Sequence, residues 1–159
     1  MQIREAQIDD AVEVCRVLRR SIVELCRADH QDDPSVLEEW LRNKTPDQAR
    51  SWMTNPESYI FVATDDAGII GVGAVSFSGQ ILLNYVSPDA RFRGVSKAIL
   101  NQLESKALER GHPACAVIST ATARRFYRSA GYEQQGAPAV ARGVTGYPMV
   151  KQLSPAATG

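Results

Sequence analysis

The residues best suited to chemistry lie between Arg91 and Lys97, in the stretch Arg-Phe-Arg-Gly-Val-Ser-Lys. An apolar run that ends at Val86 comes before this stretch, and an amphipathic helical pattern follows it directly. The first N–H groups of a helix have no intrahelical partners, and the helix dipole adds positive potential there. Gly94 lets the backbone approach an anion closely, while Ser96 adds a hydroxyl group. We interpret the stretch as a cradle for the diphosphate of a bound nucleotide cofactor.

Other anion motifs fit this part of the chain less well. A P-loop needs Gly-Lys-Ser/Thr in that order, whereas residues 94–97 read Gly-Val-Ser-Lys. Residues 70–74, Ile-Gly-Val-Gly-Ala, lie inside a strand pattern and open no helix, so they are no dinucleotide fingerprint. Two alternatives stay open: Arg91 and Arg93 are solvated loop charges, or the cradle binds a different anion.

The cradle and a second pattern downstream together resemble the GNAT N-acetyltransferase superfamily. In that family the acetyl-CoA motif reads Gln/Arg-x-x-Gly-x-Gly/Ala after a strand that ends in Val-x-Pro. Residues 91–96 read Arg-x-x-Gly-x-Ser, and residues 86–88 read Val-Ser-Pro. Residues 120–132 read Thr-x-x-Ala-x-x-Phe-Tyr-x-x-x-Gly-Tyr, similar to the family's Asn-x-x-Ala-x-x-Phe-Tyr-x-x-x-Gly-Phe. The departures are Ser96, Thr120 and Tyr132, and Thr120 leaves a side-chain contact with the cofactor in question.

The resemblance implies acetyl-CoA (coenzyme A) as the cofactor. It implies that the amides from Phe92 to Lys97 hold the phosphates, and that the backbone near Tyr85 and Val86 pairs with the pantetheine arm. The implied cofactor-binding residues are Tyr85, Val86, Arg91, Phe92, Arg93, Gly94, Val95, Ser96, Lys97, Thr120, Ala123 and Tyr127.

The resemblance also implies two roles in the reaction. The N–H of Val86 would polarise the thioester carbonyl, and the hydroxyl of Tyr127 would protonate the departing sulfur. The alternative for Tyr127 is that its ring only packs on its helix.

The residue that would deprotonate the amine is not evident. Residues 80–84, Gln-Ile-Leu-Leu-Asn, contain no carboxylate. Glu24, Asp29, His30 and an ordered water stay open as the base, and Asn84 could position a water or a substrate amide.

Composition excludes several other classes of function. The 159 residues include 18 basic and 18 acidic side chains, which argues against bulk binding to nucleic acid or to an anionic membrane. The three cysteines fall within apolar patterns and predict reduced, buried thiols in a cytoplasmic protein. No metal-ligand spacing is present, and the N-terminus has no signal-peptide pattern. We expect one domain over residues 1–153 and a disordered tail over residues 154–159.

The elements expected around the motifs are three strands joined by tight turns, within residues 59–86, and a strand–helix–strand crossover to residues 114–119. A crossover requires a parallel pair, so the fold class is α/β (α+β). We therefore expect a GNAT-like, mostly antiparallel sheet with one parallel central strand pair, flanked by helices.

Outside this centre, we expect Asp10 to cap a helix with Glu13, and residues 34–43 and 46–53 to form short helices. Trp40 and Trp52 are expected to pack, or else to line a substrate pocket. Residues 29–34 are a polar break, either a solvated loop or a negative rim that attracts a cationic substrate. Residues 136–146 are expected to form a loop between the last two strands.

The sequence therefore predicts an enzyme that transfers an acetyl group from acetyl-CoA to a primary amine of a small molecule or peptide, directly within a ternary complex. It predicts no nucleic-acid or membrane partner and is compatible with a homodimer. The alternative keeps the fold without turnover, as a regulatory module that binds acyl-CoA.

Overall fold

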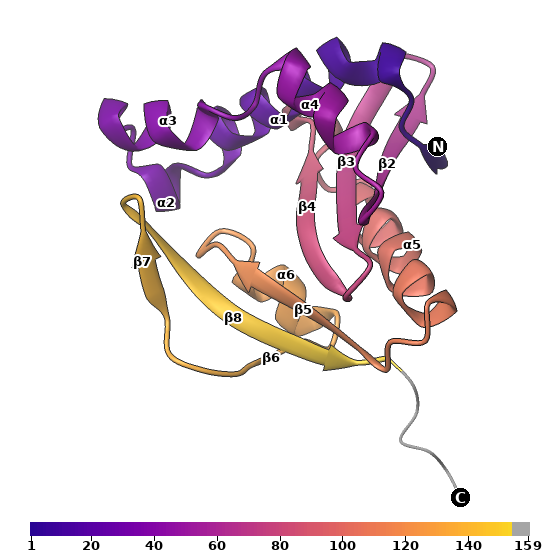
Figure 1. The fold of residues 1–159 in the computed structure, drawn as a ribbon. Helices are drawn as coiled ribbons and strands as arrows, with labels where there is room; N and C mark the ends of the chain where they lie inside the picture. Colours follow the sequence, from indigo (N-terminus) through magenta and orange to yellow (C-terminus); the bar gives the residue numbers. More distant parts are fainter. Residues whose placement is uncertain (154–159) are drawn as a thin grey trace, which may run out of the picture.

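The computed structural model describes residues 1–153 and contains a twisted sheet flanked by helices (Figure 1). The predicted disordered tail lies outside the described residues. Seven strands follow the order β1-β2-β3-β4-β5-β8-β6, and β7 pairs with β8. Their bounds are β1 Gln2–Glu5, β2 Ser58–Asp65, β3 Gly68–Ser76, β4 Gln80–Val86, β5 Ala114–Ser119, β6 Glu133–Gln134, β7 Ala139–Ala141 and β8 Val144–Gln152.

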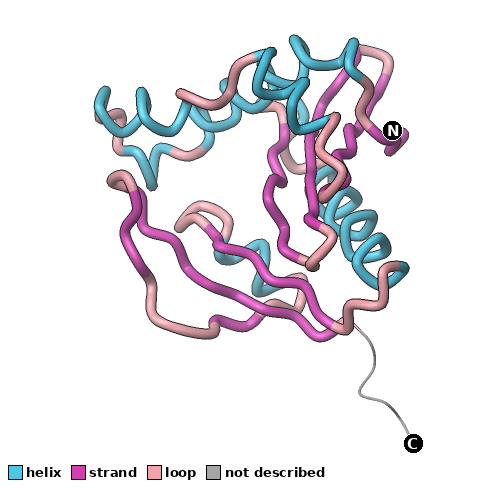
Figure 2. Tube along the Cα trace, in the orientation of Figure 1, coloured by secondary structure: helices cyan, strands magenta, loops and turns pink. Residues whose placement is uncertain are grey.

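Helices cover both faces of the sheet (Figure 2). The apolar residues of β2 alternate between the faces: Ile60 and Val62 contribute to a core cluster with α1, while Phe61 and Ala63 contribute to another with α5. The bounds are α1 Ala11–Leu25, α2 Arg27–His30, α3 Pro34–Leu41, α4 Pro46–Met53, α5 Val95–Glu109 and α6 Arg124–Ser129. Among the described residues, no helix is long and apolar enough to span a membrane.

The sheet confirms the predicted topology. The strands from β1 to β4 pair antiparallel, and β4 pairs parallel with β5 through Gln80 with Ala116 and Ile81 with Val117. Both contacts lie at the start of β4. Beyond them, β4 and β5 diverge (Figure 1).

A β-bulge accompanies this divergence. On β3, Ala74 is opposite Leu83 and Val75 is opposite Ile81, so Leu82 of β4 has no partner in the register. An extra residue bends a strand and increases its local twist. The bulge therefore helps to turn the second half of β4 away from β5.

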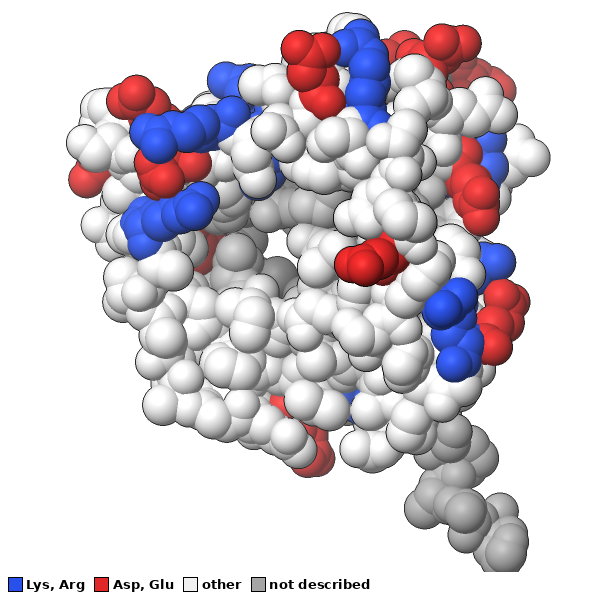
Figure 3. Space-filling model, viewed as in Figure 1, with Lys and Arg blue, Asp and Glu red and all other residues white. Residues whose placement is uncertain are grey.

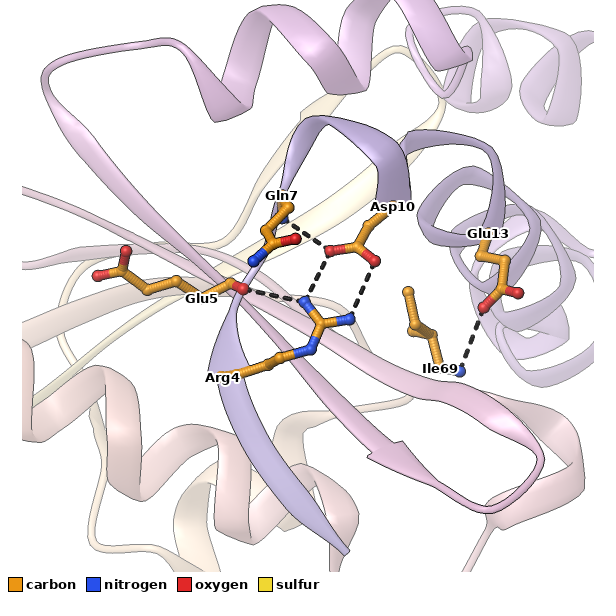
Figure 4. A network of polar contacts seen from close by, with 6 residues as sticks. All are labelled: Arg4, Glu5, Gln7, Asp10, Glu13 and Ile69. Carbon is orange, nitrogen blue, oxygen red and sulfur yellow. Dashed lines mark hydrogen bonds and ion pairs between the residues drawn. The ribbon is translucent and has the colours of Figure 1, made fainter.

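Asp10 is the N-cap residue of α1, as expected, but the expected capping by its side chain is wrong. Asp10 makes no side-chain cap bond to α1. Its carboxylate instead accepts two bonds from the Arg4 guanidinium, at 2.8 and 3.0 Å, and the N–H of Gln7 at 2.7 Å (Figure 4). Glu13 reaches across to accept the N–H of Ile69 at 3.3 Å. Both carboxylates thus bind tertiary donors, which join α1 to the sheet.

The Asp10 cluster predicts an acid-sensitive contribution to stability. The hydrogen bond from Arg4 lowers the pKa of Asp10 below its usual 3.8, so the contribution is present above about pH 3.8 and is lost as the pH falls through the folded-state value. Asp10→Asn should lower the free energy of unfolding by about 1–2 kcal/mol at pH 7, less near pH 3. Urea denaturation at both pH values measures this, with Asp9→Asn as the control. An equal loss at both pH values would contradict the prediction.

The loop expected over residues 136–146 is also wrong, because this segment contains the β7–β8 hairpin. Arg142 and Gly143 form its two-residue turn with φ values of 54° and 81°. Both central residues of a type I′ turn have positive φ, and this turn matches the twist of paired strands. The small, exposed residues of β7 gave no alternating apolar pattern, which is why the strand was missed.

Candidate active site

A cavity of about 500 Å³ occupies the gap where β4 and β5 diverge. Figure 3, in the orientation of Figure 1, shows a hollow near the centre of the molecule, with mostly uncharged residues around the opening. Of the predicted site residues, all except Arg93 line the cavity: Tyr85, Val86, Arg91, Phe92, Gly94, Val95, Ser96, Lys97, Thr120, Ala123 and Tyr127. The structure thus brings together two motifs that are distant in the sequence.

The cradle at one end of the cavity is the N-terminus of α5. Gly94 is the N-cap residue of this 15-residue helix and has a φ of 76°, a left-handed conformation that favours glycine. A Cβ atom built on Gly94 would meet no atom within 4 Å, so the space above it is open. Residues 94–97 all line the cavity, so the first turn of α5, whose N–H groups have no intrahelical partners, borders this space.

The three basic side chains of the cradle have different surroundings. Arg93 forms an ion pair with Asp65 at 3.0 Å, which directs it toward the β2–β3 turn. Arg91 stacks on the ring of Phe92, 4.6 Å from its centroid, and Phe92 itself is 92% exposed. Lys97 is exposed in the first turn of α5, where a cation is unfavourable beside the helix dipole. Arg91 and Lys97 thus provide positive charge for an anion, whereas the charge of Arg93 is partly neutralised.

The pairing of β4 with β3 determines which backbone groups of β4 face the cavity. The N–H of Ser87 donates to the carbonyl of Ile70 at 2.8 Å. Bonded and non-bonded pairs alternate along an antiparallel ladder, so the next pair, Val86 with Gly71, is non-bonded. The N–H and carbonyl of Val86 therefore point away from β3, toward the gap left by β5. Those of Tyr85 point toward β3.

Tyr127 of α6 lies on the cavity wall and is 4% exposed. Its ring packs against Phe126 and Tyr132, with centroids 5.1 and 5.3 Å away. Burial raises the pKa of Tyr127 well above its usual value, and the nearby Asn84 amide partly offsets this rise. The phenol is therefore neutral at ordinary pH and can act as a hydrogen-bond donor.

Thr120 stabilises the start of α6. Its Oγ1 accepts the N–H of Ala123 at 3.2 Å, which holds the turn between β5 and α6. Ala123 is the N-cap residue of this helix and also lines the cavity. The structure thus gives the hydroxyl of Thr120 a local partner, and a contact with the cofactor stays a prediction.

The three side chains considered as a base all have other partners. Glu24 pairs with Arg20 at 3.0 Å. The carboxylate of Asp29 accepts the N–H groups of Ala121 and Thr122 and the Thr122 hydroxyl. None of these carboxylates lines the large cavity.

His30 is buried, with 1% of its surface exposed, and both of its ring nitrogens are bonded. Its Nε2 lies 2.9 Å from the carbonyl of Ile22, and its Nδ1 accepts the N–H of Asp32 at 2.9 Å. This arrangement assigns a neutral ring with the proton on Nε2. His30 therefore has a structural role between α1 and α2.

A second, polar cavity of about 250 Å³ lies between α2, the start of α3 and the β7–β8 hairpin. Asp29 and Asp33, from the predicted polar break, contribute to its wall. Trp40 and Trp52 line neither cavity: Trp40 contacts the ring of His30, and Trp52 packs against the α1 core cluster. Their expected packing role is confirmed.

Helix α1 also contributes to the large cavity, which its sequence pattern does not predict. Ser21, Leu25 and Cys26 line it from the C-terminal end of this helix. Burial raises the pKa of the Cys26 thiol to about 12, so the thiol stays protonated. In the sequence these residues belong to an ordinary amphipathic pattern, and no local signal separates them from the core.

The comparisons with solved structures identify the fold. A GCN5-related N-acetyltransferase from Rhodopseudomonas palustris superimposes with a TM-score of 0.85, at 21% identity over 95% of this chain and 94% of that chain. The PaiA N-acetyltransferase of Thermoplasma acidophilum, solved with coenzyme A, gives 0.80 at 17% identity over 95% and 98%. An aminoglycoside 6′-N-acetyltransferase complexed with coenzyme A gives 0.72 at 17% identity, over 98% of each chain.

The structures above show the fold, whereas a match to a family model shows the family. No curated protein matches the chain. The model of the acetyltransferase (GNAT) domain matches residues 26–153, which include the cradle, the diverging strands and Tyr127. The chain therefore belongs to the GNAT family of acetyl-CoA-dependent acetyltransferases.

Proposed function

We propose that this protein transfers the acetyl group of acetyl-CoA directly to a primary amine of a small molecule or peptide, within a ternary complex. The observation that carries the proposal is the single cavity that joins the α5 cradle to Val86 and Tyr127. The diphosphate would bind at the cradle, and the pantetheine arm would extend between β4 and β5. The thioester would then lie between the N–H of Val86 and the hydroxyl of Tyr127.

Direct transfer is favoured over an acetyl-enzyme intermediate. Cys26 is the one cysteine among the residues that line the cavity, and its raised pKa keeps it a thiol, which is a poor nucleophile. The amine must then attack the thioester carbon itself. Its nitrogen would form the new C–N bond as the C–S bond breaks. Tyr127 would give its proton to the sulfur and regain one from the amine through water. Because no carboxylate or imidazole of residues 1–153 lines this cavity, a water molecule is the proposed carrier of the amine proton.

The acceptor would enter from the side of α2 and the β7–β8 hairpin. The polar cavity there opens beside Ala121, which follows β5, and Asp33 adds negative charge. This environment favours a cationic amine over an acidic one. The aminoglycoside 6′-N-acetyltransferase among the structural neighbours is in keeping with a polar amine acceptor.

A screen for release of free CoA from acetyl-CoA tests this function, with panels of polyamines, amino acids, aminoglycosides and peptide N-termini. We expect amine-dependent release and the acetylated amine in mass spectra. CoA binding without release for any amine would favour the alternative, a regulatory module that binds acyl-CoA.

Arg91 should contribute more to cofactor binding than Arg93. Arg91→Ala should weaken CoA binding by about 1–3 kcal/mol, since a charged donor facing a phosphate is lost. Arg93→Ala is the matched control and should have a smaller effect, because Arg93 already pairs with Asp65. Calorimetry with CoA and with pantetheine measures both variants. An equal loss for both ligands would mean that Arg91 does not contact the phosphates.

A further inference from the structure

Asn84 is a polar residue of β4 on the wall of the large cavity. Its Nδ2 donates to the carbonyl oxygen of Ser96, in the first turn of α5, at 3.3 Å. Its Oδ1 is buried, and it is the one buried side-chain polar atom of residues 1–153 without a hydrogen-bond partner. The orientation of the amide follows from Ser96, because a carbonyl oxygen accepts and would repel Oδ1.

An unpaired buried acceptor destabilises a folded protein, and native structures contain few of them. The Nδ2 of Asn84 donates to Ser96, and the amide lies close enough to Tyr127 to affect the pKa of that phenol. The Oδ1 of Asn84 is the atom of this amide that has no partner. Within residues 1–153 no donor is bonded to this oxygen, so a bound molecule can supply its partner.

The position of Asn84 shows on which side this donor must lie. The neighbouring side chains Leu83 and Tyr85 pack against the α1 core cluster, on the other face of the sheet. Because side chains alternate along a strand, Asn84 faces α5 and α6. Ser96 and Tyr127 also line the cavity. This is the side of the cradle, whereas the second, polar cavity is lined by α2, the start of α3 and the β7–β8 hairpin.

We propose that Asn84 is a cofactor-positioning residue, whose Oδ1 accepts the N–H of a secondary amide in the pantetheine arm. This inference rests on the proposed function. The arm carries two amide N–H groups and would pass between β4 and β5, within the gap that Asn84 faces. The contact fixes the depth of the arm between the anion cradle and Tyr127. It also satisfies Oδ1, so the bound protein has no orphan acceptor at this position.

The test compares two ligands and two substitutions. Asn84→Leu has nearly the same shape and removes both polar groups, and Asn84→Ala leaves space in case leucine does not fit. We expect CoA to bind about tenfold to a hundredfold more weakly to both variants. ADP, which has the diphosphate but no pantetheine arm, should bind unchanged. Asn101→Leu, at an exposed position of α5, is the matched control and should bind both ligands normally.

A thermal melt of the unliganded protein gives a further readout. Asn84→Leu should melt at the same temperature as the wild type or higher, because an unsatisfied acceptor is removed. Unchanged CoA affinity in both variants, or an equal loss for ADP and CoA, would overturn the inference. Failure of the wild type to bind CoA would instead overturn the proposed function.

Discussion

Gly94→Glu should abolish CoA binding, with a loss of more than about a hundredfold, and leave the fold intact. A carboxylate would lie among the N–H groups that a phosphate needs, and repulsion between the two anions adds to the loss. Apart from its two chain neighbours, no atom of residues 1–153 lies within 4 Å of the new Cβ atom, so packing is not disturbed. The one structural cost is the φ of 76°, about 1–2 kcal/mol for a residue other than glycine.

Gly111→Glu is the matched control for this substitution. Gly111 follows the other end of α5, has a φ of 86° and also has no atom within 4 Å of a built Cβ. It therefore shares the backbone strain without the nearby cradle. Calorimetry should show normal CoA binding for Gly111→Glu and none for Gly94→Glu, with similar melting temperatures. Comparable binding by both variants would rule out the cradle as the phosphate site.

Tyr127→Phe should lower kcat by about a hundredfold or more, with little change in the Kd for acetyl-CoA. The substitution retains the buried ring and removes only the hydroxyl. Burial raises the pKa of Tyr127, so the hydroxyl is protonated at ordinary pH, and the same burial would raise the proton affinity of the departing thiolate. The loss should therefore appear in the chemical step, measured as single-turnover transfer to an amine found in the screen.

Tyr132→Phe separates the chemical role from a packing role. The ring of Tyr132 lies in the same aromatic cluster, 5.3 Å from that of Tyr127, and its hydroxyl donates to Glu104 at 2.8 Å. Its loss should cost about 1–2 kcal/mol of stability and leave kcat unchanged. If Tyr127→Phe also lowered only the melting temperature, Tyr127 would be a packing residue and water the proton donor.

The sequence alone predicts those parts of the site that are formed by residues close together along the chain. Gly94 and the helical pattern after it predict an anion cradle, because a helix N-terminus forms from consecutive residues. The strand–helix–strand order predicts the parallel pair of β4 and β5, since a crossover allows no other direction. Tyr127 was found by its motif, on a helix that the structure confirms.

Only the tertiary structure decided which side chains are available for chemistry. By residue type, Asp29 and His30 could act as a base. In the structure, the Asp29 carboxylate accepts hydrogen bonds from residues 121–122, and the His30 ring is bonded to a carbonyl of α1. The divergence of β4 from β5 is accompanied by a register shift at Leu82 that no periodicity reveals.

Asn84 is the opposite case, because the structure leaves one of its polar atoms without a partner. In the sequence it is one polar residue in an apolar strand, and a water or a substrate amide was a reasonable partner. In the folded protein, α5 places the carbonyl of Ser96 against its Nδ2, and its Oδ1 is buried without a partner. Hydrogen-bond satisfaction depends on partners that are distant along the chain, so it is determined by the packed fold and not by local pattern.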